Sequence, residues 1–172
     1  MTRYQLAKLV QWAGTLRTRK RLQKVVFLLK TAGFPFDDEF SLHYFGPYSS
    51  DVAERTDEMT NLGLLEEQSV GNVAGQQYNY TLTGEAQQRL ASLEATPQGQ
   101  TMAKQVTLFK DQAKQLLDTD VRELEVAATI VYFRQQGCKW SEAVLHTCSF
   151  KGYKPDDSVV KDAEALARTV LP

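Results

Sequence analysis

The fold class of this chain follows from residues 64–82, which read LLEEQSVGNVAGQQYNYTL. Both ends of the stretch are rich in residues that favour β-strands, and residues 71–75 in its middle contain two glycines and an asparagine. A tip of this kind between two strand-like runs is typical of a β-hairpin. We therefore predict strands over residues 64–70 and 77–82, with a tip from Gly71 to Gln76.

Three helical patterns precede the hairpin. Apolar residues recur at helical spacing in a first helix that Gly14 closes, a second that ends at Gly33, and a third that ends at Gly63. Residues 39–45 alternate and contain three aromatic side chains, so they predict a short strand between the second and third helices. Residues 46–50 (GPYSS) predict the turn that leads into the third helix.

A fourth helix is predicted after the hairpin, from its cap Thr83 to about Ala95. The order helix, helix, strand, helix, hairpin is that of a winged helix-turn-helix domain. We therefore predict an α+β, mostly helical fold, with a winged helix-turn-helix domain over residues 1–96 and a helical C-terminal region over residues 97–172. This region is expected to pack on the first or to form a dimer, since its helix over residues 121–136 is apolar on a wide arc.

Composition limits the class of protein. Apolar residues make up 42% and charged residues 24%, as in an ordinary soluble globular protein. No apolar run approaches the roughly 20 residues that span a bilayer, and the N-terminus MTRYQLAKLVQWAG lacks the apolar stretch of a signal peptide. We therefore expect a cytoplasmic protein with no membrane partner. Cys138 and Cys148 predict buried free thiols rather than a disulfide framework or a zinc site.

Charge is divided unevenly along the chain, although the net charge is −1. Residues 1–34 contain eight Lys and Arg and no acid, whereas residues 35–99 contain eleven Asp and Glu and two bases. The remaining residues contain ten of each sign. We expect the basic and acidic segments to face each other, either within one fold or across a dimer.

Five cations gather around the start of the second predicted helix. Cations there oppose the helix dipole, and such a local conflict can mark a functional surface. One interpretation is contact with the phosphates of DNA or with another anion. The other is a solvated helix face, or pairing with the acids of residues 37–39. The candidate anion-contacting residues are Arg17, Arg19, Lys20, Arg21 and Lys24.

The third predicted helix would be the recognition helix of a winged domain, yet residues 50–59 carry four acids and one arginine. Phosphates would repel such a helix, and the hairpin tip has no Lys or Arg to replace it. A protein partner could instead contact this helix and the aromatic residues before it, although core packing explains those aromatics equally well. The candidate partner-contacting residues are Tyr44, Phe45, Tyr48, Asp51, Glu54, Asp57 and Glu58.

Four motifs occur together and in order: residues 20–29 (KRLQKVVFLL), 43–49 (HYFGPYS), 61–65 (NLGLL) and 80–83 (YTLT). In this combination the chain resembles the bacterial YwgA-type proteins, a family described as winged-helix or regulator-like. A looser similarity extends to SocA-like (Panacea) domains, which occur in antitoxins and proteolytic adaptors. The resemblance implies a winged-helix fold, departs from the winged-helix pattern at residues 84–86 (GEA), and implies no biochemical activity.

No catalytic motif stands out in the sequence. A glycine-rich phosphate loop, Gly-x-Ser-x-Gly and His-Glu-x-x-His are all absent. His43 and His146 lie far apart, and Cys148 would face a different side of a helix from His146. We therefore predict a protein that is not an enzyme and has no cofactor and no metal.

Two functions follow from these patterns. The first is a regulatory protein that binds DNA through the basic second helix. The alternative is a protein-interaction module of the adaptor or antitoxin type, which uses the acidic third helix and the aromatic turn. A homodimer through the C-terminal region is a further expectation.

Overall fold

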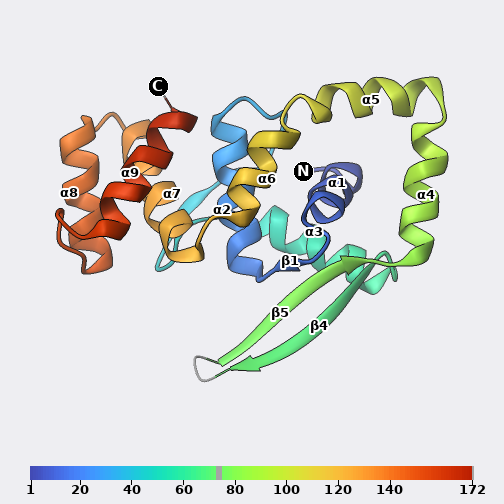
Figure 1. Ribbon diagram of the computed structural model, residues 1–172, viewed down its shortest axis with the longest axis horizontal. Helices are drawn as coiled ribbons and strands as arrows, with labels where there is room; N and C mark the ends of the chain where they lie inside the picture. Colours follow the sequence, from blue (N-terminus) through green and yellow to red (C-terminus); the bar gives the residue numbers. More distant parts are fainter. Residues whose placement is uncertain (73–74, 172) are drawn as a thin grey trace.

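The hairpin lies where the sequence predicts it, in a computed structural model that describes residues 1–72 and 75–171. Strands β4 (Leu65–Asn72) and β5 (Gly75–Leu82) pair antiparallel, with Leu65 opposite Leu82. Val73 and Ala74 of the predicted tip lie outside the described residues. Figure 1 shows the hairpin projecting away from the helices that form the body of the molecule.

A third strand completes this sheet. Strand β1 (Leu16–Arg17) pairs antiparallel with β5, which gives the order β1-β5-β4. Leu16 is buried and lies opposite Tyr80, also buried. The sequence pattern does not reveal β1, because two residues are too few to show the alternation that marks a strand.

The first three helices begin and end close to the predicted positions. They are α1 (Arg3–Ala13), α2 (Arg19–Thr31) and α3 (Ser50–Asn61). Thr2 caps α1 by accepting a hydrogen bond from the backbone N–H of Gln5, and Gly14 closes that helix with a positive φ. Thr18 caps α2 in the same way, through the N–H of Arg21.

A two-stranded sheet replaces the single strand predicted over residues 39–45. Strands β2 (Ser41–His43) and β3 (Gly46–Tyr48) pair antiparallel, and Tyr44 and Phe45 form the turn between them. The turn predicted over residues 46–50 was therefore wrong, because Gly46–Tyr48 is a strand. A glycine and a proline are depleted in strands, so the local pattern assigns them to a turn.

The C-terminal half is entirely helical within the described residues. Residues 97–118 form two helices that divide at Leu108 and Phe109, where Phe109 packs against Phe34 with ring centroids 5.1 Å apart. The helices are α4 (Gly84–Glu94), α5 (Pro97–Thr107), α6 (Lys110–Asp118), α7 (Val121–Gln135), α8 (Trp140–Lys151) and α9 (Ser158–Val170).

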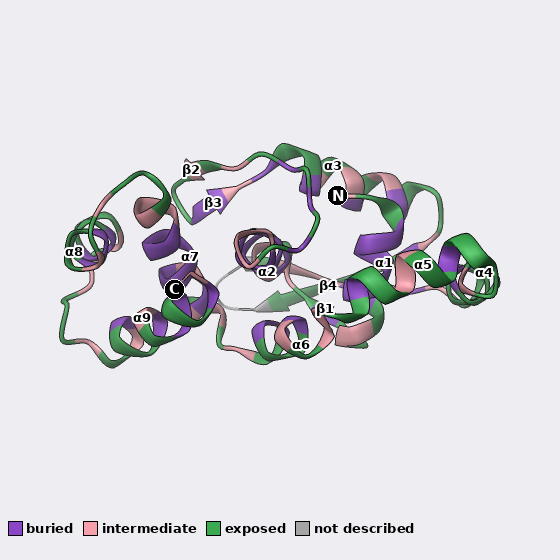
Figure 2. Cartoon of the chain, turned by 90° about the horizontal axis from the view of Figure 1, so that it is seen from above, coloured by how far each residue is buried: buried purple, intermediate pink, exposed green. Residues whose placement is uncertain are grey.

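Helix α2 lies in the middle of the molecule, as Figure 2 shows in a view from above. Its buried face packs against α6 and α7 from the C-terminal half and against β3 and α3. Helix α7 is apolar on a wide arc because it packs on α2, α8 and α9. No helix in the described ranges is both long enough and apolar enough to cross a membrane. The boundary between residues 96 and 97 remains a prediction.

Candidate functional site

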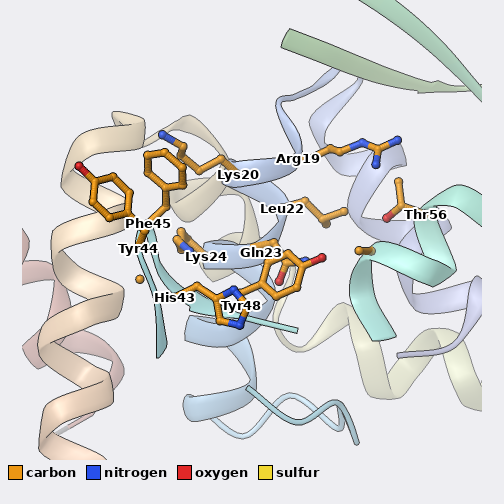
Figure 3. Close-up of a pocket in the computed structure, with 12 residues that line it drawn as sticks. Arg19, Lys20, Leu22, Gln23, Lys24, His43, Tyr44, Phe45, Tyr48 and Thr56 are labelled. Atoms are coloured by element: carbon orange, nitrogen blue, oxygen red, sulfur yellow. The ribbon is translucent and has the colours of Figure 1, made fainter. Parts of the chain in front are cut away.

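A cavity of about 340 Å³ opens between α2, the β2–β3 turn and α3 (Figure 3). Its lining is mostly apolar and aromatic, and we call it the aromatic pocket. The lining residues are Arg19, Lys20, Leu22, Gln23, Lys24, His43, Tyr44, Phe45, Gly46, Tyr48, Ala53 and Thr56. Residues from both predicted sets, the anion-contacting and the partner-contacting one, therefore meet at one cavity.

Aromatic side chains form one wall of the pocket. Tyr44 is 80% exposed and Phe45 is 52% exposed, and their rings meet edge to face with centroids 5.0 Å apart. The ammonium of Lys20 lies 4.1 Å from the centroid of the Phe45 ring. His43 and Tyr48 stack with centroids 4.8 Å apart. Large rings are thus held at the surface instead of being packed into the core.

Two close contacts fix the backbone that carries these aromatic side chains. Gly46 has a φ of +91°, and a Cβ there would lie 2.7 Å from Thr129 Oγ1 on α7. Glycine is therefore required both by the backbone conformation and by the approach of α7. On the other side, Gln23 donates to the carbonyl oxygen of Ser49 across 2.9 Å and accepts from its N–H across 2.8 Å.

Lys24 supports the pocket from beneath. Its side chain is buried, and Nζ donates to the carbonyl oxygen of Pro47 across 2.6 Å. Burial, with Lys151 and Lys20 nearby, lowers the Lys24 pKa to about 7, although the Glu125 carboxylate acts against this shift. Lys24 therefore ties β3 to α2 and is not one of the cations that a surface-bound anion would meet.

The other predicted anion-contacting residues are mostly engaged within the chain. The Arg19 guanidinium contacts Asp57 at 2.7 Å and Glu67 at 2.9 Å, and Figure 3 shows it pointing away from Tyr44 and Phe45. Arg21 donates to the carbonyl oxygens of Leu117 and Thr119, where cations stabilise the end of α6.

Arg17 differs from these cations. It is exposed and has no ion pair among the described residues. It lines a second, more polar pocket together with Arg21 and Asp118. A cation free to meet an external anion therefore lies at this second pocket and not at the aromatic one.

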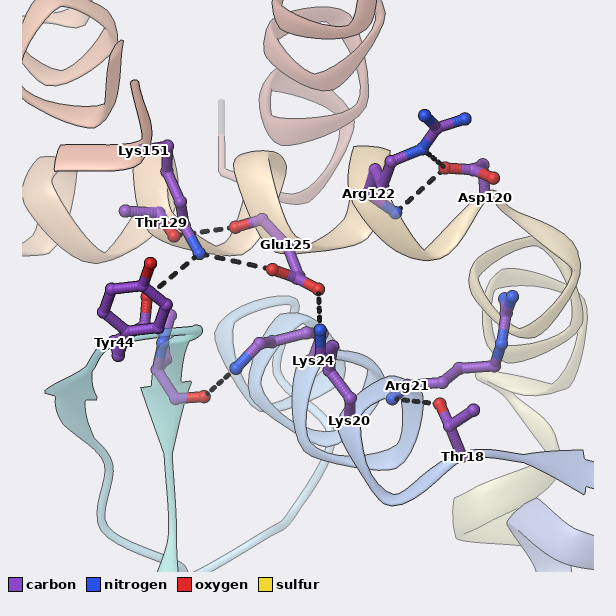
Figure 4. A network of polar contacts seen from close by, with 11 residues as sticks. Thr18, Lys20, Arg21, Lys24, Tyr44, Asp120, Arg122, Glu125, Thr129 and Lys151 are labelled. Carbon is purple, nitrogen blue, oxygen red and sulfur yellow. Dashed lines mark hydrogen bonds and ion pairs between the residues drawn. The ribbon is translucent and has the colours of Figure 1, made fainter. Parts of the chain in front are cut away.

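Glu125 connects the two halves of the chain beside the aromatic pocket (Figure 4). One carboxylate oxygen lies 2.7 Å from the Lys20 ammonium, and the other lies 3.4 Å from that of Lys151. Lys151 also reaches the carbonyl oxygen of Tyr44 at 3.5 Å. Helices α7 and α8 thus hold the β2–β3 turn through charged side chains.

The acids of α3 divide into paired and unpaired groups. Asp57 contacts Arg19, and Glu58 contacts Arg3 and Arg55. Asp51 and Glu54 are exposed and have no ion pair in the described part of the chain. Lys8 and Glu94, 3.0 Å apart, form another ion pair between the basic and acidic segments. The sequence left pairing within one fold or across a dimer open, and these ion pairs lie within one fold.

The chain is similar in sequence to a known bacterial protein. No family model matches the chain. It is 30% identical over 132 residues to the uncharacterized protein YwgA of Bacillus subtilis (strain 168), a match that covers 74% of this chain and 72% of that protein. The chain belongs to the YwgA family. The resemblance inferred from the four sequence motifs is thereby confirmed at the level of the YwgA family.

Several residues that shape the site in this YwgA-family chain were not selected from the sequence. They include Gln23, His43, Gly46 and Thr129. Gln23 had a visible signal, since it and Lys24 are the two polar residues in the otherwise apolar run of residues 22–29 on α2. The contact of Gly46 with Thr129 had none, because two segments far apart in the sequence create it.

The thiols of this YwgA-family chain lie away from the pocket. Cys148 is buried, and burial together with Asp157 raises its pKa. The structure brings Cys138, not Cys148, close to His146, with Sγ 3.7 Å from Nδ1. Across residues 1–72 and 75–171, no three His, Cys, Asp or Glu side chains are grouped as a metal site requires.

Proposed function

We propose that this chain is a non-enzymatic binding module that holds a protein partner on the aromatic pocket. The observation that carries the proposal is the exposure of Tyr44 and Phe45, at 80% and 52%, at the edge of a mostly apolar cavity. Large exposed aromatic side chains beside a concave apolar surface are typical of protein–protein interfaces. Core packing does not account for rings that are this exposed.

The backbone around the pocket supports the same proposal. Gln23 fixes Ser49, Lys24 fixes Pro47, and α7 lies directly against Gly46. Each contact holds the β2–β3 turn in one conformation before a partner arrives. A preorganised turn lowers the entropy lost on binding, which makes the exposed rings more effective anchors.

DNA binding through α2 is the second candidate function, and one observation favours it. Arg17 is exposed and has no ion pair in the part of the chain that the structure describes, so it is free to meet a phosphate. The order of α1, β1, α2 and α3 before the β4–β5 hairpin also supports the proposal of a winged-helix arrangement for residues 1–96. Arg17 lies on β1, however, and the cations of α2 itself are engaged within the chain, which weakens the DNA-binding proposal.

The binding module proposed here is of the adaptor or antitoxin type, as the looser similarity to SocA-like domains implies. The proposal that this chain binds a specific protein rests on the pocket and not on that similarity. A homodimer through the C-terminal region remains a further proposal.

Photo-crosslinking tests the proposed function. A benzophenone side chain at Phe45 is expected to capture a protein in cells that express the chain, whereas the same group at Leu108, 84% exposed but remote, is expected not to. The captured protein, once purified, should bind the chain and lose at least tenfold in affinity on Phe45→Ala. Equal capture from both positions would contradict the proposal.

Salt-dependent fluorescence anisotropy tests the second candidate. Tight binding of duplex DNA at about 50 mM salt, lost on Arg17→Glu, would favour DNA over a protein partner. Arg17→Glu is the appropriate variant because Arg17 is exposed, whereas Lys24→Glu would place a charge in the core.

A further inference from the structure

The size of the aromatic pocket restricts what can fill it. Its volume of about 340 Å³ lies at the lower end of the range for ligand pockets, so one large side chain with its neighbours fills it. Leu22 is fully buried at its floor, and Ala53 of α3 lines the opposite wall. An aromatic or large aliphatic side chain therefore matches the interior.

Several polar groups at the pocket are already bonded within the chain. Both ends of the Gln23 amide bond the backbone of Ser49, and the Thr56 hydroxyl donates to the carbonyl oxygen of Val52. The Lys24 ammonium donates to Pro47. A charged side chain inserted here would lose its hydration against a lining that is mostly apolar, which favours an apolar inserted group.

The free charge beside the pocket is negative. Arg19 and Lys20 line the pocket, but carboxylates of this chain already pair with both of them. Asp51 and Glu54, by contrast, are exposed and outside any ion pair of the described residues. Glu54 follows the lining residue Ala53 on α3 and points about 100° further round the helix, so it lies outside the pocket lining but on the same helical turn as Ala53. Residues that flank the inserted side chain can therefore reach unpaired carboxylates near the start of α3.

The exposed ring of Tyr44 offers a second contact for a cation. One face of Phe45 is occupied by Lys20, whereas Tyr44 is 80% exposed. A guanidinium or ammonium group can stack on such a ring. A phosphate group could neither stack on Tyr44 as a cation does nor pair with Asp51 and Glu54, which would repel it.

On these grounds, and resting on the function proposed above, we infer that the partner presents a basic segment. An aromatic or large aliphatic side chain of this segment enters the pocket. A Lys or Arg within about four positions of that side chain contacts Asp51 and Glu54. Charge complementarity of this kind determines which partner is selected and how fast it binds. The acidic α3, which disfavours nucleic acid, then becomes the element that recognises the partner.

Selection from a random peptide library on the intact chain tests this inference. The selected peptides are expected to combine an aromatic or large aliphatic residue with a neighbouring Lys or Arg. Their affinity should fall about tenfold or more in Asp51→Lys/Glu54→Lys, and the loss should shrink at high salt because these carboxylates are exposed. The control Asp156→Lys/Asp162→Lys makes the same change of charge at exposed, unpaired acids elsewhere in the described residues, and should bind like the wild type.

A variant that fills the cavity separates the pocket from general attraction between charges. Ala53→Phe, checked for folding by circular dichroism, should abolish binding of the selected peptides. Peptides that compete at the pocket but show no preference for Lys or Arg, or prefer acids, would overturn the inference while leaving the proposed function intact. Unchanged binding by Ala53→Phe, or the absence of any selected peptide, would also overturn it. Crosslinking of Phe45 to DNA alone would overturn both proposals.

Discussion

Lys24 donates a hydrogen bond from Nζ to the carbonyl oxygen of Pro47 across 2.6 Å, and no carboxylate of the described residues lies within ion-pair distance of it. A buried ammonium held by a neutral carbonyl costs stability whenever it is charged. Its pKa is lowered to about 7 by burial and by the nearby ammonium groups of Lys151 and Lys20, against the opposing effect of Glu125.

The first prediction concerns the dependence of stability on pH. Between about pH 7 and pH 10.5, the unfolded chain keeps a proton on Lys24 that the folded chain has released. Stability therefore rises with pH in this window, by roughly 3–5 kcal/mol for this group alone. Urea unfolding at several pH values should show this rise in the wild type and a smaller rise in Lys24→Met. Lys154→Met, at an exposed lysine, should keep the wild-type slope.

The second prediction concerns Gly46. Gly46→Ala should lower the free energy of unfolding by about 3 kcal/mol or more, because it combines a strained φ with a clash against Thr129. Gly137→Ala is the matched control, since Gly137 has a similar φ of +93° and no atom within 4 Å of an added Cβ. It should cost about 1 kcal/mol. Equal losses by the two variants in chemical denaturation would show that contact with α7 contributes nothing.

The third prediction concerns Gln23. Gln23→Leu should destabilise the fold by about 1–3 kcal/mol, because it leaves the Ser49 N–H buried without a partner and leaves the Ser49 carbonyl oxygen with only the 3.4 Å hydrogen bond from the Ala53 N–H. Partner binding at the pocket should weaken as well, since Ser49 follows the wall-forming Tyr48. Gln87→Leu, at an exposed glutamine with a single bond to a carbonyl, should cost less than about 1 kcal/mol by thermal denaturation.

The fourth prediction concerns the two thiols. Cys138 is partly exposed, whereas Cys148 is 4% exposed and has its pKa raised by burial and by Asp157. Titration with an aromatic disulfide reagent should therefore show one fast thiol in the folded chain and two after denaturation. Cys138→Ser should remove the fast reaction, and Cys148→Ser should leave it unchanged. Two fast thiols in the native wild type would contradict the packing of α8.

Much of the fold could be predicted from local patterns. The caps at Thr2, Thr18 and Thr83 and the apolar face of α2 act within a few residues, so the sequence alone reveals most helices and the hairpin. Strands β1 and β3 could not be predicted in this way. Each is only two or three residues long, and each forms through pairing with another segment.

The candidate site was predictable only as two separate sets of residues. The sequence marks cations on α2 and aromatic residues before α3, but it does not show that they line one cavity. Lys24 illustrates the difficulty. Spacing places it with the exposed basic residues, whereas the approach of β3 and α7 buries it. Burial of a charge depends on distant segments and has no local signature.

The contact between Gly46 and Thr129 has a consequence for synthesis of the protein on the ribosome. Gly46 emerges well before α7, which supplies Thr129 and Glu125, and chains grow at roughly 5–20 residues per second. For several seconds the nascent chain carries Tyr44 and Phe45 on a turn without its supporting wall. We therefore expect the chain to bind its partner only after α7 has been synthesised. A product of translation that stops before α7 should not compete with the full-length chain for the partner.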